Sequence, residues 1–74
     1  MLVTSTGIGA ASCAIAVEEL IQCGVHNLIR IGSCGTLQKE IRLGDLILVQ
    51  GAVRDEGTSR TYIDSIYPAI PDFE

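Results

Sequence analysis

Apolar residues recur at helical spacing in one stretch of the chain, residues 10–23. This stretch contains no Gly or Pro, and its apolar positions return every three or four residues. One face would carry Ala10, Cys13, Ala14, Val17, Leu20 and Ile21, and the opposite face Ser12, Glu18, Glu19 and Gln22. Gly24 follows directly and is a natural C-terminal stop. The pattern therefore predicts an amphipathic helix over residues 10–23.

Three short apolar stretches have the length and composition of β-strands: residues 2–5, 26–31 and 46–49. A glycine-containing turn follows each of the first two, Thr6-Gly7-Ile8-Gly9 and Gly32-Ser33-Cys34-Gly35. Strand, glycine turn, helix and strand make a βαβ unit, in which the two strands run parallel. The continuous apolar run of the third stretch is typical of a strand that is covered on both faces.

The predicted fold class is α/β, with a partial parallel or mixed sheet that contains one βαβ unit. A single helix covers only one face of such a sheet. The chain also begins inside a predicted strand, and Pro71-Asp72-Phe73-Glu74 has the pattern of a helix start with Asp72 as its N-cap. We therefore expect residues 1–74 to form part of one larger α/β domain.

Composition and charge exclude several classes of function. The 74 residues include nine acids and five scattered bases, a net charge of −4, so nucleic acid is not an expected partner. No apolar run approaches the roughly 18 residues of a membrane span, and residues at the N-terminus do not have the basic and then apolar pattern expected of a signal peptide. The three cysteines form no CxxC pair, which indicates reduced thiols in a cytoplasmic protein rather than disulfides or structural zinc.

The first glycine turn allows two interpretations. Ligands of open parallel sheets bind beyond the carboxyl ends of the strands, where this turn would lie. Gly7-Ile8-Gly9-Ala10-Ala11-Ser12 is one residue short of the dinucleotide fingerprint. Arg30, at the end of the second predicted strand, would suit the 2′-phosphate of NADP, so an NADP-binding Rossmann-type fragment is one hypothesis. A tight strand-to-helix turn without a ligand is the other.

The segment 30–35 has the residue types of a phosphate site. The Arg30 guanidinium is able to bind an oxyanion through two hydrogen bonds, and Ser33 adds a hydroxyl donor. Gly32 and Gly35 leave the backbone of the turn open to a ligand. The alternative is that Arg30 pairs with an acid of the chain, either Asp45 or Asp55.

Five motifs occur in order along nearly the whole chain. They are Val3-Thr4-Ser5-Thr6-Gly7-Ile8-Gly9, Ala16-Val17-Glu18-Glu19-Leu20, Arg30-Ile31-Gly32-Ser33-Cys34-Gly35, Ala52-Val53-Arg54-Asp55-Glu56-Gly57-Thr58-Ser59 and Tyr67-Pro68-Ala69. Together they resemble the nucleoside phosphorylases of the uridine phosphorylase and bacterial purine nucleoside phosphorylase type. The resemblance implies an α/β sandwich and a reversible phosphorolysis of a uridine or purine nucleoside to free base and ribose 1-phosphate. It implies no organic cofactor, with phosphate as co-substrate.

The resemblance also implies roles for single residues. By position, Arg30, Gly32 and Ser33 would bind phosphate. Ser33, together with Cys34 and Gly35, would contact the nucleoside. We expect these five residues to form half of a phosphate site and part of a nucleoside pocket.

A metal site and an assembly are implied in the same way. The Ile8 carbonyl and the Ser12 hydroxyl would be ligands of a monovalent cation at a subunit interface. The alternative is that Ser12 simply caps the start of the helix. The parent enzyme would be a homo-oligomer, built from dimers into a hexamer.

The chain also departs from the family pattern. It lacks the upstream glycine-to-arginine phosphate loop, the downstream Met-Glu ribose segment and the residues that recognise the base, and no general acid is evident. We therefore expect the parent enzyme, but not this chain alone, to be active. A non-catalytic binding module of the same fold is a further hypothesis. Residues 54–59 have the composition of a solvated charged loop, although such a loop could approach the rim of the pocket.

Overall fold

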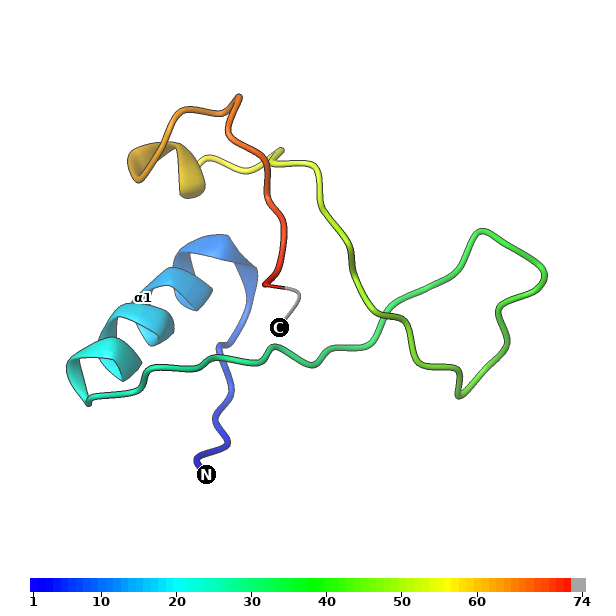
Figure 1. Ribbon diagram of the computed structural model, residues 1–74, viewed down its shortest axis with the longest axis horizontal. Coiled ribbons are helices and arrows are strands. Elements are labelled where there is room, and N and C mark those ends of the chain that lie inside the picture. Colours follow the sequence, from blue (N-terminus) through cyan, green and yellow to red (C-terminus); the bar gives the residue numbers. More distant parts are fainter. Residues whose placement is uncertain (73–74) are drawn as a thin grey trace.

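The structure, a computed structural model, describes residues 1–72 and contains one α-helix and one short 3-10 helix in that range. Helix α1 spans Gly9–Gln22 and helix η1 spans Ser59–Thr61. Long segments without regular structure connect them (Figure 1). The predicted helix is confirmed, with both ends one residue earlier than expected. The helix start predicted at the C-terminus extends into Phe73 and Glu74, which lie outside the described residues.

Helix α1 is amphipathic in the way that the sequence pattern predicts. Its apolar positions Ala10, Cys13, Ala14, Val17 and Leu20 are half-buried, whereas Glu18 and Glu19 are exposed. Ile21 differs from the prediction, because this residue of the last turn is 53% exposed. The half-buried stripe identifies the face on which the rest of the chain packs.

The C-terminal end of α1 is fixed by Gly24, as predicted. Gly24 has a φ of +90°, a conformation that glycine adopts without strain. Its N–H donates to the Ile21 carbonyl at 3.0 Å, and the Val25 N–H donates to the Leu20 carbonyl at 3.2 Å. This pair of hydrogen bonds is the Schellman motif, which satisfies carbonyls that the helix leaves open and turns the chain away.

The three predicted strands do not form within residues 1–72, so the predicted sheet is not confirmed in this chain. Residues 2–5, 26–31 and 46–49 run without strand partners (Figure 1). A strand is stabilised by hydrogen bonds to a neighbour at about 4.8 Å, and apolar patterning alone does not supply that neighbour. The described residues contain one antiparallel bridge, in which the Ala52 N–H donates to the Ala69 carbonyl at 2.9 Å.

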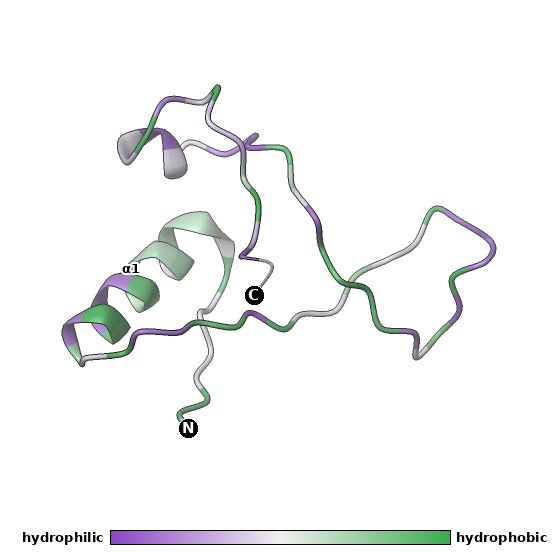
Figure 2. Ribbon diagram, viewed as in Figure 1, coloured by the Kyte–Doolittle hydropathy of each residue, from purple (hydrophilic) through white to green (hydrophobic). Residues whose placement is uncertain are grey.

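No side chain among residues 1–72 is fully buried. Large apolar residues of the predicted strands are almost completely exposed, with 89% of Ile29, 99% of Leu46 and 93% of Leu48 accessible to solvent. Figure 2 shows hydrophobic residues along the irregular segments as well as on α1. The chain therefore carries the apolar residues of a sheet without a core formed around them.

Residues 52–69 form a loop that folds back on itself and lies over α1 (Figure 1). The bridge between Ala52 and Ala69 closes its base, and η1 lies at its far end. Arg54, Glu56, Thr58 and Ser59 are half-buried in this loop. Residues 54–59 form the predicted loop, but it is only partly solvated, because Arg54 and Glu56 are half-buried and make hydrogen bonds within the loop.

Candidate functional site

The first glycine turn leads directly into α1 with a left-handed backbone. Gly7 has a φ of +73° and Gly9 a φ of +88°. The Ser12 hydroxyl, in the first turns of the helix, donates to the Thr6 carbonyl. A Cβ atom on Gly7 would lie 2.6 Å from the Ser12 hydroxyl oxygen, so a side chain here would force Ser12 to shift. Glycine is thus favoured here both by the dihedral angle and by the approach of Ser12.

Ser12 does not cap the helix. The N-cap residue of α1 is Ile8, which has an extended backbone and provides no side-chain cap. Ser12 uses its hydroxyl proton on the carbonyl of Thr6 instead, which ties the glycine turn to the helix. The capping alternative for Ser12 is therefore wrong.

The second glycine turn is open to solvent. Arg30, Gly32, Ser33, Cys34 and Gly35 are all exposed. The Arg30 guanidinium folds over the turn, since a Cβ atom on Gly32 would lie 3.3 Å from both of its terminal nitrogens. The absence of a side chain at Gly32 leaves the space that the guanidinium occupies.

Within the described part of the chain, Arg30 makes no hydrogen bond or ion pair with an acid. Asp45 instead accepts a hydrogen bond from the Arg42 N–H at 2.8 Å and closes a local turn. The pairing of Arg30 with Asp45 or Asp55, the alternative left open by the sequence, is therefore not observed. The Arg30 side chain is exposed to solvent in the same turn as Ser33.

The structure does not join the two glycine turns directly. Across residues 1–72, no hydrogen bond or ion pair connects residues 6–12 with residues 30–35. The two predicted cation ligands, Ile8 and Ser12, lie at the start of α1, apart in sequence from the Arg30 turn. The same residues contain no group of three or more His, Cys, Asp or Glu side chains placed to hold a metal ion.

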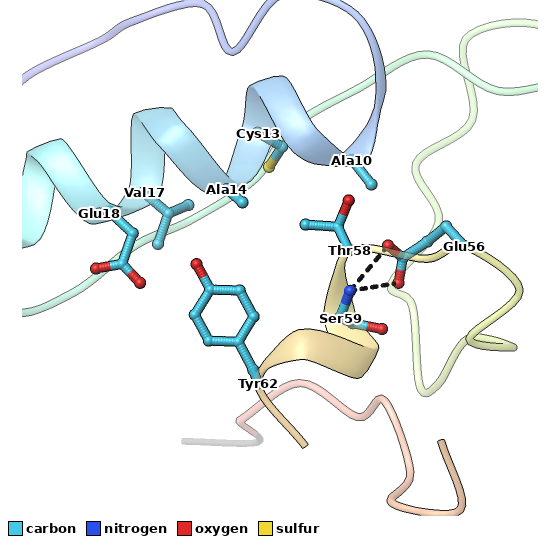
Figure 3. Close-up of a pocket in the computed structure, with 9 residues that line it drawn as sticks. All are labelled: Ala10, Cys13, Ala14, Val17, Glu18, Glu56, Thr58, Ser59 and Tyr62. Atoms are coloured by element: carbon cyan, nitrogen blue, oxygen red, sulfur yellow. Dashed lines mark hydrogen bonds between the residues drawn. The ribbon is translucent and has the colours of Figure 1, made fainter. Parts of the chain in front are cut away.

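A groove of about 280 Å³ lies between α1 and the loop 52–69 (Figure 3). It is mostly apolar, and the residues that line it are Ala10, Cys13, Ala14, Val17, Glu18, Glu56, Thr58, Ser59 and Tyr62. The helix contributes the half-buried stripe described above, and the loop contributes Thr58, Ser59 and the Tyr62 ring. In the described residues, the loop 52–69 therefore lies against the apolar face of α1.

Two acids in the groove have defined partners. The Glu56 carboxylate accepts hydrogen bonds from the Ser59 N–H at 3.0 and 3.3 Å (Figure 3). Hydrogen bonds from Ser59 hold the pKa of Glu56 below its ordinary value. On the helix side, hydrogen bonding to the Glu18 carboxylate raises the pKa of the Tyr62 hydroxyl. The Glu56–Ser59 hydrogen bonds thus fix the start of the 56–62 segment.

Arg54 is the most extensively hydrogen-bonded side chain among the described residues. Its Nε–H donates to the Ser59 hydroxyl at 3.1 Å. Its terminal nitrogens donate to four backbone carbonyls at 2.5 to 3.0 Å, those of Ser59, Ile63, Asp64 and Tyr67. One guanidinium therefore holds together carbonyls between residues 59 and 67 of the loop.

No sequence pattern marks Arg54 or Tyr62 as a functional residue. The partners of Arg54 are mainly backbone carbonyls, which every residue possesses, so no residue type marks them. Tyr62 is 61% exposed and stands in a segment without helical or strand periodicity. The one available signal was an arginine next to a Gly- and Ser-containing turn, a pattern that is common on protein surfaces.

Comparison with known proteins supports the motifs. The family model described as "Phosphorylase superfamily" matches residues 1–74. The chain is 47% identical over all 74 residues to a guanosine phosphorylase of Halorubrum lacusprofundi and covers 31% of that protein. It is 54% identical over 72 residues, 97% of the chain, to a uridine phosphorylase of Thermococcus kodakarensis and covers 26% of it. A uridine phosphorylase of Escherichia coli is 43% identical over the whole chain, which covers 29% of it.

The chain thus spans between about a quarter and a third of the length of the curated relatives that it matches. No solved structure matches it. None of the helices in residues 1–72 is both long and apolar enough to span a membrane. The superfamily implies an α/β fold, in agreement with the fold class predicted from the sequence. On the match over its entire length, this chain belongs to the phosphorylase superfamily.

Proposed function

We propose that the protein to which this chain contributes is a nucleoside phosphorylase, which cleaves a nucleoside with phosphate to a free base and ribose 1-phosphate. The observation that carries the proposal is the similarity to proteins named uridine or guanosine phosphorylase, at 43 to 54% identity over nearly every residue of the chain. Because the chain spans a minor part of those proteins, we propose the activity for the whole protein and not for residues 1–74 alone.

The Arg30 turn is the proposed phosphate site. The Arg30 guanidinium has no acid partner among residues 1–72, and it lies over Gly32, the residue before Ser33. A charged donor that is not neutralised by the protein favours an anionic ligand, and a guanidinium matches phosphate oxygens in pairs. Arg30, Gly32 and Ser33 would hold the phosphate, and Ser33, Cys34 and Gly35 would contact the nucleoside.

The chemistry of the reaction explains why such a site is needed. A phosphate oxygen forms a bond to the anomeric carbon of the ribose, while the bond from that carbon to the base nitrogen breaks. The bonding electron pair leaves with the base, which takes up a proton. The phosphate has to be held in line under a sugar carbon that becomes positively charged, so positioning and charge complementarity carry most of the catalysis.

The test of this function is the dependence of base release on phosphate in the whole protein, with uridine and guanosine as substrates. We expect Arg30→Ala to weaken phosphate use roughly tenfold to hundredfold, the loss of hydrogen bonds to a charged group worth ~1.5–3 kcal/mol. Arg60→Gln is the matched control, because Arg60 is an exposed arginine on η1. Base release that proceeds equally well without phosphate would overturn the proposal.

A monovalent cation and an assembly are parts of the same proposal. The Ile8 carbonyl and the Ser12 hydroxyl oxygen would be two of the cation ligands, at an interface between subunits of a dimer-based hexamer. The donation of the Ser12 proton to Thr6 leaves lone pairs on the Ser12 oxygen for such a cation. Activity in potassium chloride against choline chloride tests the cation, and light scattering of the whole protein tests the assembly.

A further inference from the structure

We propose that Arg54 is a positioning residue for the phosphate step, acting through the loop 52–69 and helix α1. The inference rests on the proposed function. Arg54 itself touches only atoms of its own loop, so it is not a catalytic residue. Its effect on the reaction would pass from the loop to the helix and from the helix to the glycine turn.

The first step is that Arg54 fixes the shape of the loop. Its five acceptors come from Ser59, Ile63, Asp64 and Tyr67, so the chain must follow one path around the guanidinium. The bridge between Ala52 and Ala69 closes the base of the same loop. A compact surface loop that is filled by its own side chain and closed at its ends behaves as one unit.

The second step is that this unit packs on α1. Thr58, Ser59 and Tyr62 of the loop and Ala10 and Cys13 of the helix line the same groove (Figure 3). Apart from this contact, little in the described part of the chain covers the apolar stripe of α1. The position of the helix therefore depends on the loop keeping its shape.

The third step runs from α1 to the candidate site. Ala10 lies one residue after Gly9, and Ser12 binds the Thr6 carbonyl, so the start of the helix and the glycine turn move together. Residues 1–72 form no sheet by themselves, but the superfamily implies an α/β fold, in which the turns that follow neighbouring parallel strands lie at one edge of the sheet. A shift of α1 would displace the glycine turn relative to the Arg30 turn and so weaken the hold on phosphate.

The guanidinium geometry gives a sharp test. Lysine keeps the positive charge, but its single nitrogen cannot span five acceptors as the planar guanidinium does. In the whole protein, we expect both Arg54→Lys and Arg54→Gln to raise the KM for phosphate about tenfold, with kcat changed much less. Arg60→Gln, on the same loop, should leave both constants at the wild-type value. A mere loss of folded protein would lower kcat and leave KM unchanged.

The outcomes separate this inference from the proposed function. If Arg30→Ala weakens phosphate use but Arg54→Lys behaves like Arg60→Gln, the positioning role is wrong and the function stands. If Arg30→Ala has no effect either, the proposed function is wrong as well. If the Arg54 variants do not fold, Ser59→Ala replaces them in the test. It removes the hydroxyl that accepts a hydrogen bond from Arg54 Nε but keeps the backbone carbonyls that Arg54 also binds. We expect it to raise the KM for phosphate about twofold to fourfold, and an unchanged KM would overturn the inference.

Discussion

The two arginines Arg30 and Arg54 show how the same side chain serves different purposes. Arg54 is half-buried, and its donors are taken up by five acceptors of the protein. Arg30 is exposed and has no hydrogen bond or ion pair within residues 1–72. A guanidinium whose donors are occupied stabilises a fold, whereas one whose donors are open is suited to an external oxyanion. The contrast supports a structural role for the first and a binding role for the second.

Glu56 provides a prediction about pH at the scale of one residue. Hydrogen bonds from Ser59 lower its pKa, so the folded loop binds the Glu56 proton less tightly than the unfolded chain does. This contribution to stability is complete above the ordinary pKa of glutamate and is lost as the pH falls through the lowered value. We expect the amide resonance of Ser59 to titrate with a midpoint below the ordinary glutamate range.

The control for this titration is Glu56→Gln, which should abolish the pH dependence of the Ser59 resonance in that range. Asp55, the neighbouring exposed acid, gives a second comparison, because Asp55→Asn should leave the midpoint unchanged. A midpoint at or above the ordinary value would mean that the Glu56–Ser59 hydrogen bonds do not form in solution.

At the scale of elements, the glycine turn before α1 separates two physical effects. Gly7 and Gly9 both have positive φ, but only Gly7 lacks space, because Ser12 lies against it and nothing lies within 4 Å of a Cβ atom on Gly9. We expect Gly9→Ala to destabilise the whole protein by the strain of a left-handed alanine, about 1–2 kcal/mol. Gly7→Ala should destabilise it further, because the steric overlap with Ser12 adds to the same strain.

Chemical denaturation of the whole protein measures both changes. The double variant Gly7→Ala with Ser12→Ala removes the steric overlap but keeps the backbone strain. Its loss of unfolding free energy relative to Ser12→Ala should therefore approach the loss that Gly9→Ala causes relative to the wild type. Gly35→Ala is the matched control, since Gly35 has neither a positive φ nor a neighbour within 4 Å. Equal stabilities of Gly7→Ala and Gly9→Ala would contradict the close approach of Ser12.

The elements also show which parts of the structure the sequence predicts. Helix α1 was predicted to within one residue at each end, because its periodicity and Gly24 act locally. The three predicted strands do not form in the described residues, because a strand needs hydrogen bonds to a neighbouring strand as well as a suitable sequence of its own. The hydrogen bonds of Arg54 are not predictable for a related reason, since most of its acceptors are backbone carbonyls, which have no signature in the sequence. The Arg30 turn was recognised through its motif, and its roles in phosphate and nucleoside binding stay predictions.

At the scale of the whole molecule, the chain is more open than a folded domain of its size. It exposes 7341 Å² of surface, whereas a folded protein of 7.9 kDa would expose about 4,400 Å². Its radius of gyration is 14.2 Å, against about 11 Å for a compact domain of this length. The apolar residues of the extended segments account for much of this difference, because they face solvent. In this arrangement, residues 1–72 obtain little stability from burial.

This openness leads to a prediction for the isolated 74-residue chain. Because the chain has no buried core, its enthalpy of unfolding should be small. A helix of 14 residues is also only marginally stable in water by itself. We expect calorimetry of the monomeric chain to show no heat-capacity peak and its far-ultraviolet circular dichroism to change gradually on heating. A cooperative domain of this length would absorb roughly 50 kcal/mol at its midpoint. A sharp peak of that size, with sedimentation showing a monomer, would mean that the chain buries a core in solution, and its apolar segments would then have to pair with each other.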